Sequence, residues 1–184
     1  MAVRSTMTAI LARVRFLIND QAGPNQVFSD QEIQDIADSF RDEMRYYELS
    51  FGETILPGGN IVFLDYYSTI GGDWEPDGVF QCNTWATVVP DSQDWLVGKW
   101  SFIAQPKYPI YLTGKRYDVY RISAELLENW AGKVKFDITF SSQGQSFSRS
   151  EKINNLMSLA KLYRSKQQTV KRAMNVRSDI SPYQ

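Results

Sequence analysis

A segment rich in glycine and proline contains Trp74 together with three carboxylates, Asp73, Glu75 and Asp77. Paired carboxylates are the only candidate catalytic groups in this chain. A glycosidase places two carboxyl groups across a cleft, and a calcium site uses an oxygen-rich loop. The segment has neither the spacing of an EF-hand loop nor its terminal glutamate. We therefore interpret these residues as solvated turn carboxylates rather than as a catalytic or metal site.

The residue types that are missing exclude most other chemistry. The 184 residues include no histidine, which removes the commonest general base, the Ser-His-Asp and Cys-His arrangements and nearly all zinc and iron sites. Cys82 is the only cysteine, so no internal disulfide is possible, and its apolar strand predicts a buried thiol. We expect no enzyme activity, no cofactor and no metal, and we keep a carboxylate hydrolase only as a third alternative.

The net charge of −1 conceals two oppositely charged blocks. Residues 20–53 have a net charge of −7, and residues 149–184 have a net charge of +6. Such blocks suit head-to-tail association between copies of one chain. Two solvated helix faces explain the same pattern equally well.

Aromatic residues concentrate in the middle of the chain, where they could stack on sugars or bases. We favour the simpler interpretation that a small module needs large side chains to form any core. A carbohydrate- or cell-surface-binding module remains the alternative function. The aromatic residues concerned are Tyr66, Tyr67, Trp74, Trp85, Trp95 and Trp100.

Helical periodicity predicts four amphipathic helices, over about 6–19, 30–48, 117–134 and 148–170. Capping boxes support two of the starts, Ser29 with Glu32 and Ser148 with Glu151. The apolar stripes place a common set of side chains in the core. This set is Phe40, Leu127, Trp130, Leu156, Ala160 and Tyr163.

Between residues 51 and 114 the helical period disappears, and short β-rich runs alternate with clusters of glycine and proline. The expected strands cover residues 61–67, 78–82, 85–89, 99–103 and 110–112, and a further short strand is expected over 135–140.

The expected fold is therefore α+β. A four-helix bundle (1–50 and 115–173) carries an inserted small antiparallel β module (51–114), with a short β-turn before the last helix and an extended C-terminal tail (174–184). No apolar run approaches the roughly 18–20 residues of a membrane helix, and we expect that the N-terminal segment is not a signal peptide.

Three segments, 11–38, 114–137 and 140–166, resemble the head–tail connector (adaptor) proteins of long-tailed bacteriophages. The most specific pieces are YDVY…ELLENWA and GQSFSRS. The middle pieces GGDWEPDGVF and LVGKWSF are similar to the insert of part of that family. This chain differs where relatives tend to have an alanine run, because it has Arg121, Ile122 and Ser123 there.

The resemblance implies a structural virion protein of the neck, made in the cytoplasm of the host bacterium. Such proteins form a ring, usually of twelve copies, beneath the portal protein of the DNA-filled head. The ring extends the channel through which double-stranded DNA passes without sequence-specific binding. It also docks the next neck or tail protein, a stopper or tail terminator, and no active site, cofactor or membrane contact is expected.

Two sets of contact residues follow as hypotheses. For the ring, an acidic face of the second helix (Asp35, Asp38 and Asp42) meets a basic face of the neighbouring copy, formed by Arg149, Lys152, Arg164 and Lys166. For the portal protein, an extended C-terminal arm supplies apolar anchors, because the tail keeps large side chains that a solubilising tail would not need. The arm residues are Met174, Val176, Arg177, Ile180 and Tyr183.

Overall fold

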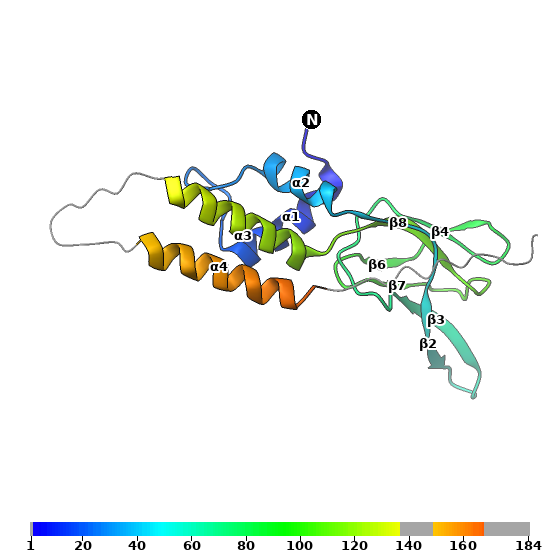
Figure 1. The fold of residues 1–184 in the computed structure, drawn as a ribbon. Helices are drawn as coiled ribbons and strands as arrows, with labels where there is room; N and C mark the ends of the chain where they lie inside the picture. The colour runs from blue at the N-terminus through cyan, green and yellow to red at the C-terminus, as the bar shows by residue number, and fades with distance from the viewer. Residues whose placement is uncertain (1, 137–148, 168–184) are drawn as a thin grey trace, which may run out of the picture.

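The computed structural model describes residues 2–136 and 149–167, which form a helical body joined to a β module (Figure 1). The helical body contains η1 (Ser5–Met7), α1 (Thr8–Ile18), α2 (Asp30–Ser39), α3 (Val119–Phe136) and α4 (Arg149–Ser165). The β module contains β1 (Asp42–Glu48), β2 (Ser50–Ile55), β3 (Ile61–Tyr67), β4 (Val79–Gln81), β5 (Thr87–Val88), β6 (Ser92–Asp94), β7 (Lys99–Ser101) and β8 (Tyr111–Arg116).

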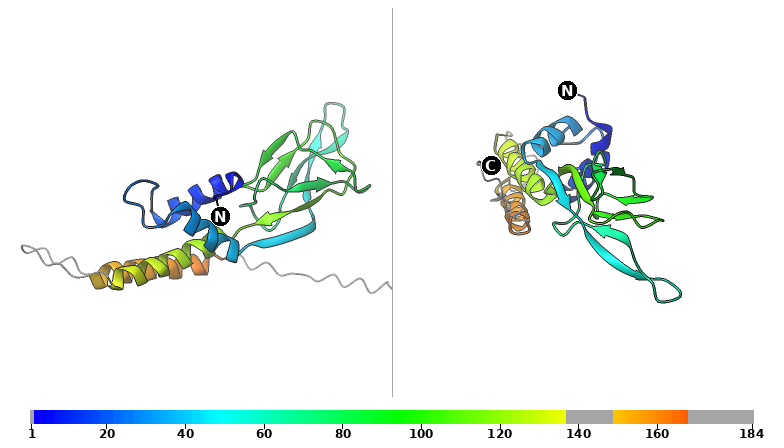
Figure 2. Two further views of the ribbon diagram at one scale, coloured as in Figure 1. Left: turned by 90° about the horizontal axis from the view of Figure 1, so that it is seen from above. Right: turned by 90° about the vertical axis from the view of Figure 1, so that its right-hand side faces the viewer.

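The helical body is organised around α3, which contacts α1, α2 and α4. Helix α4 runs antiparallel along α3, as the views in Figures 1 and 2 show. One apolar core joins all four helices, with Val14, Ile33, Leu127 and Ala160 among its buried residues. The capping box of Ser29 and Glu32 forms as expected, so the start of α2 is fixed by its own sequence.

The β module consists of two four-stranded antiparallel sheets in the order β1-β8-β4-β5 and β2-β3-β7-β6. Leu49 alone separates β1 from β2, and the chain passes there from the first sheet to the second. A second apolar core lies in this module, and its largest buried members are Trp74, Trp100 and Tyr66. The β2–β3 hairpin projects beyond the rest of the module (Figure 1).

The expected four-helix bundle is wrong. The described residues form an α+β fold with four α-helices and two sheets, and α1 and α2 have only 11 and 10 residues against 18 in α3. The second helix was expected to continue to residue 48. Instead α2 ends at Ser39 and the chain enters β1, which pairs with β8. Strand pairing therefore replaces the second half of a helix that the bundle required.

The misleading signal in β1 was the three-residue gap between Met44 and Tyr47, which matches a helix. The pairing with β8 shifts register between these two residues, a β-bulge that places Arg45 and Tyr46 opposite Thr113. In a regular strand, residues three apart point to opposite faces, but the extra residue of the bulge puts Met44 and Tyr47 on the same face. Both side chains pack against the core of the β module. A bulged strand thus imitated helical spacing.

The other expected elements are confirmed in part. Strand β3 has the expected bounds, and three other expected runs contain β4, β5 and β7. The run expected over 110–112 covers only the start of β8, and β1, β2 and β6 were not expected. The strand expected over 135–140 is wrong for residues 135 and 136, which end α3, and its remainder lies outside the described residues. The expected capping residue Ser148 also lies outside them, as does the tail 174–184.

The predicted helical core is close to the observed one. Leu127, Ala160 and Tyr163 are buried in it. Three other predicted members are only partly buried and pack against its edge: Phe40, Trp130 and Leu156. Cys82 is buried in the β module, as expected.

Candidate functional site

A polar cluster joins the helical body to the β module. The guanidinium of Arg4 donates to both carboxylate oxygens of Asp38, at 2.7 and 2.6 Å, and its Nε donates to Glu75 Oε1 at 3.0 Å. The Tyr117 hydroxyl donates to Glu75 Oε2 at 2.8 Å, and the Thr6 hydroxyl also donates to this carboxylate. Three segments far apart in the sequence therefore meet at the Glu75 carboxylate, and Asp38 of α2 joins the cluster through Arg4.

Local backbone geometry explains why Glu75 reaches this cluster. Trp74 pairs with Arg116 in an isolated bridge, and Glu75 N donates to Lys115 O at 2.8 Å, so the backbone here is extended alongside β8. Alternate residues of an extended chain point to opposite sides. The Trp74 side chain enters the core of the β module, and that of Glu75 faces the helices. Asp73, whose backbone is not extended, is placed on the helical side by its pair with Arg13.

Asp73 forms a second link between the two parts. Arg13 of α1 donates to Asp73 Oδ1 at 2.6 Å, and Asp73 has a φ of 63°. The loop packs closely on the turn before β7, because a Cβ at the preceding Gly72 would lie only 1.8 Å from the Leu96 carbonyl oxygen. Burial raises the pKa of Asp73 from its usual 3.8 to about 6, against the opposing effect of Arg13.

These carboxylates are anchors rather than catalytic groups. The expectation that they are solvated is wrong for Asp73 and Glu75, of which 8% and 0% of the surface is exposed. Burial by itself would raise the pKa of Glu75, but the hydrogen bonds from Thr6, Tyr117 and Arg4 outweigh it and hold that pKa below its usual value. An ionised, fully enclosed carboxylate cannot reach a substrate. Only Asp77 remains exposed, paired with Lys115.

The described residues contain no group of three or more histidine, cysteine, aspartate or glutamate side chains that could hold a metal ion. Within the same residues, no helix has the length and apolar character needed to span a bilayer.

The acidic residues predicted for the ring do not share one helix face. Asp35 is exposed and accepts from Gln31 at 2.7 Å, whereas Asp38 is held by Arg4. Asp42 lies on β1, not on a helix, with its carboxylate 4.0 Å from the Arg116 guanidinium. Of the three, Asp35 is the one most available to a neighbouring molecule.

The basic residues predicted for the ring all belong to α4 or its C-terminal end. Arg164 is already paired with Glu125 and Glu128 of α3, at 3.2 and 2.6 Å. The Lys152 ammonium lies 5.6 Å from the centre of the Trp130 ring, and that of Lys166 lies 5.8 Å from the Tyr120 ring. Arg149 is the first residue of α4. The predicted portal contacts Met174, Val176, Arg177, Ile180 and Tyr183 lie outside the described residues.

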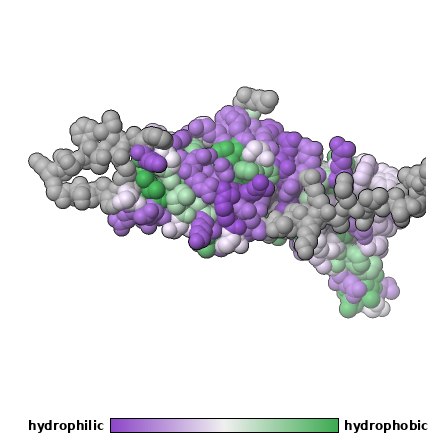
Figure 3. All heavy atoms as spheres, viewed as in Figure 1, coloured by the Kyte–Doolittle hydropathy of each residue, from purple (hydrophilic) through white to green (hydrophobic). Residues whose placement is uncertain are grey.

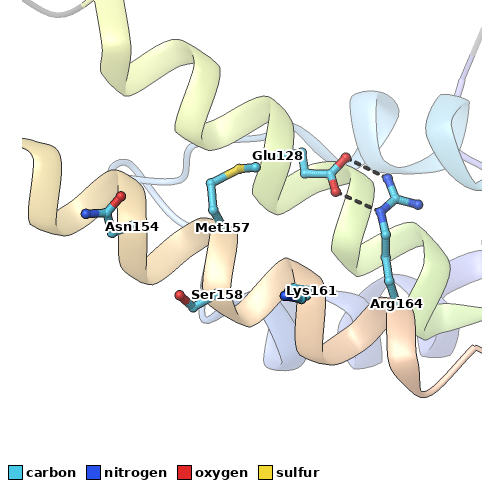
Figure 4. A pocket seen from close by; sticks show the side chains of 6 residues that line it. All are labelled: Glu128, Asn154, Met157, Ser158, Lys161 and Arg164. Atoms are coloured by element: carbon cyan, nitrogen blue, oxygen red, sulfur yellow. Dashed lines mark hydrogen bonds and ion pairs between the residues drawn. The ribbon is translucent and has the colours of Figure 1, made fainter.

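Two hollows follow the pair of long helices. The first, of about 470 Å³, lies over the Glu128–Arg164 pair that bridges α3 and α4 (Figure 4). Its lining residues are Glu128, Asn154, Met157, Ser158, Lys161 and Arg164. The second, of about 550 Å³, lies between the end of α1, α3 and α4, with Leu127, Trp130 and Leu156 in its lining.

Large apolar side chains are exposed on the β2–β3 hairpin and on α4. Ile55, Leu56 and Ile61 lie at the tip of the β2–β3 hairpin, which is green in Figure 3. Met157 and Leu162 are exposed on α4, and Met157 lies in the hollow beside Glu128 of α3 (Figure 4). Exposed apolar residues grouped on a protruding element are typical of protein contact surfaces.

The interpretation of the aromatic residues as core is confirmed for Tyr66, Trp74 and Trp100, which are fully buried. Trp95 is partly buried against them. Tyr67 and Trp85 are exposed, with 43% and 58% of their surface accessible. Two of the six aromatic residues are therefore available to a ligand.

Sequence reasoning missed Arg4 and Tyr117 as members of the polar cluster. Arg4 precedes the first expected helix, 6–19, and Tyr117 was identified only as the start of the expected helix 117–134. Their partner Glu75 is 71 and 42 residues away in the sequence. A contact between residues so far apart in the sequence cannot be predicted from a local sequence pattern.

No protein-family model matches the chain, and searches of curated proteins and of solved structures found no match either.

Proposed function

We propose that this protein is a structural virion protein, a head-to-tail connector (adaptor) that forms a ring beneath the portal protein. The ring would extend the DNA channel and dock the next neck or tail protein, a stopper or tail terminator. It would contain twelve copies and would lie in the neck of a virion assembled in the bacterial cytoplasm.

One observation carries this proposal. The segments 11–38, 114–137 and 140–166, which resemble connector proteins, supply all of the long helices of the helical body. Buried residues from each of them, such as Val14, Leu127 and Ala160, share one apolar core. The described residues of the three segments thus contribute to one core, and this grouping supports the proposal together with their resemblance to connectors.

The distribution of exposed apolar residues supports an assembly role. The exposed apolar residues of α4 and those at the tip of the β2–β3 hairpin belong to different parts of the molecule (Figure 1). A ring contact is heterologous, so each copy must present two different surfaces. Two separate apolar patches on one chain meet that requirement, and the burial of Glu75 and Asp73 removes the strongest argument for catalysis.

The test is assembly on the portal protein. The full chain is mixed with the portal protein of the same phage and examined by cryo-electron microscopy. The proposal expects a ring of this chain on one end of the portal, coaxial with its channel. A chain that stays unbound at concentrations well above those used for assembly would contradict it.

Charge variants test the ring contact separately. Asp35→Lys or Lys152→Glu should each reduce ring assembly, and the double charge swap should restore it, because the pair would again have opposite signs. Exposed pairs contribute only about 0–1 kcal/mol each, so twelve repeated contacts are needed for a visible effect. Lys161→Glu, on the same helix but outside the predicted contact, is the control. Equal loss in the control would refute the pairing.

Asp38 and Arg164 are unsuitable for this experiment. Both already form ion pairs within the chain, with Arg4 and with Glu125 and Glu128, so their reversal would change folding and assembly together.

A further inference from the structure

An exposed row of aromatic rings lies on one face of the sheet β1-β8-β4-β5. Trp85, in the β4–β5 turn, stacks on Tyr111 of β8 with ring centres 5.5 Å apart and an interplanar angle of 14°. Tyr46 of β1 meets the Trp85 ring edge-on at 5.3 Å. The neighbouring β8 residue Leu112 is buried in the core, so by strand alternation Tyr111 is on the opposite, outer face.

The fold holds two of these rings outward at a conformational cost. Tyr46 and Trp85 have φ values of 53° and 61°, a region that bulky side chains rarely adopt. Tyr46 occupies the bulge of β1, and its N–H donates to the Thr113 hydroxyl at 3.1 Å instead of to a strand carbonyl. Strained positions that are maintained by their surroundings concentrate at binding sites. Here two of them touch each other, and both rings are more than half exposed.

The row continues into a pocket. Glu48 lies opposite Tyr111 in the β1–β8 register, so the two side chains share a face. The Tyr108 hydroxyl donates to Glu48 Oε1 at 3.3 Å. Both residues line a pocket of about 370 Å³ at the point where the chain crosses between the two sheets. Tyr67, 43% exposed, and Phe51 complete its aromatic wall.

This combination fits a sugar better than other ligands. Aromatic faces take the apolar C–H face of a pyranose ring, and a carboxylate accepts hydrogen bonds from adjacent hydroxyl groups. A pocket of mixed polar and aromatic lining beside a flat stack provides both kinds of contact. A nucleic acid is disfavoured, because the Glu48 carboxylate would repel its phosphates at the pocket.

We propose that the outer face of this sheet binds a neutral oligosaccharide, with Trp85 and Tyr46 stacking on its sugar rings and Glu48 in the adjoining pocket accepting from its hydroxyl groups. This binding activity is independent of the connector proposal, because it requires neither a ring nor a portal protein.

The experiment titrates the full chain with cellohexaose and with chitohexaose by isothermal titration calorimetry. We expect millimolar or tighter binding of at least one of these probes. Trp85→Ala should weaken it about tenfold or more, since loss of one stacking partner removes that order of affinity. Trp85→Tyr should retain most of it, and Glu48→Gln should weaken it several-fold while leaving the fold intact.

Phe16→Ala is the matched control, because Phe16 is 83% exposed on α1, outside the β module. The proposal is overturned if neither probe binds at millimolar concentration, or if the control loses as much affinity as Trp85→Ala. A third outcome also overturns it. If the probes fail to bind and Trp85→Ala instead abolishes binding of the portal protein, the aromatic row is a protein-docking surface.

Discussion

Replacement of Glu75 by alanine is expected to destabilise the protein more than any other single carboxylate change in the β module. Its carboxylate is fully buried and accepts hydrogen bonds from Arg4, Tyr117 and Thr6, and Lys115 Nζ lies 3.6 Å away. Hydrogen bonds to a charged group contribute about 1.5–3 kcal/mol each.

The net loss is smaller than the sum of these bonds. Arg4 keeps its two hydrogen bonds to Asp38 after the substitution, and it is partly exposed to water. Tyr117 is fully buried, and its remaining contact to Asp38 is long, at 3.4 Å. The variant therefore leaves mainly the Tyr117 and Thr6 hydroxyls without a good acceptor. We expect a loss of about 3 to 4 kcal/mol, a large part of the usual 5–15 kcal/mol of a domain.

The assay is urea unfolding followed by tryptophan fluorescence, whose signal comes from all five tryptophans and includes Trp74 beside the substituted residue. Asp77→Ala is the control, because Asp77 is an exposed carboxylate in the same segment, paired with Lys115 at 2.5 Å. An exposed pair is expected to contribute no more than about 1 kcal/mol. If Glu75→Ala costs no more than this control, the cluster does not hold the two parts together and the reasoning is refuted.

A double-mutant cycle isolates the ion pair. Arg4→Ala and Glu75→Ala should be less destabilising together than the sum of the single changes, by about 1–3 kcal/mol, because each single variant leaves a partner unsatisfied. Additive costs would mean that the two residues act separately.

Three further predictions follow from the same contacts. The pKa of Asp73 is about 6 in the folded protein, above its usual 3.8, so the folded state binds a proton on this carboxyl group more tightly than the unfolded state does. The free energy of unfolding therefore includes a stabilising contribution from Asp73 below about pH 4, which is lost as the pH rises through about 6. Wild type should thus lose stability relative to Asp73→Asn over that interval, and parallel curves of unfolding free energy against pH would contradict the assignment. Trp130→Ala should cost about 2 kcal/mol in thermal or urea unfolding, about half of the loss for a fully buried tryptophan, because Trp130 lies at the core edge and meets Phe28 only edge-on at 6.4 Å. A chain truncated after Ala173 should keep its helical circular dichroism and unfolding midpoint yet fail to co-sediment with the portal protein, and normal co-sedimentation would move the portal contact to the helical body.

Local patterns predicted much of the secondary structure correctly. The Ser29–Glu32 capping box, the apolar stripe of α3 and the β-branched and aromatic run of β3 are short-range features. Each depends on residues within a few positions, so sequence periodicity is enough to find them. The absence of histidine and the single cysteine likewise restrict the chemistry without any structure.

The position of β1 and the environment of Glu75 were decided only by tertiary structure. Residues 42–48 have spacing that suits a helix, and pairing with β8, 63 to 74 residues further along, selected a bulged strand instead. Glu75 looked like a turn carboxylate, and Arg4, 71 residues away, made it a buried anchor. The same bulge turned Tyr46 outward beside Trp85. Spacing within one segment cannot encode such contacts, because the free energy of a strand pair or a buried ion pair belongs to both partners and exists only after the chain has brought them together.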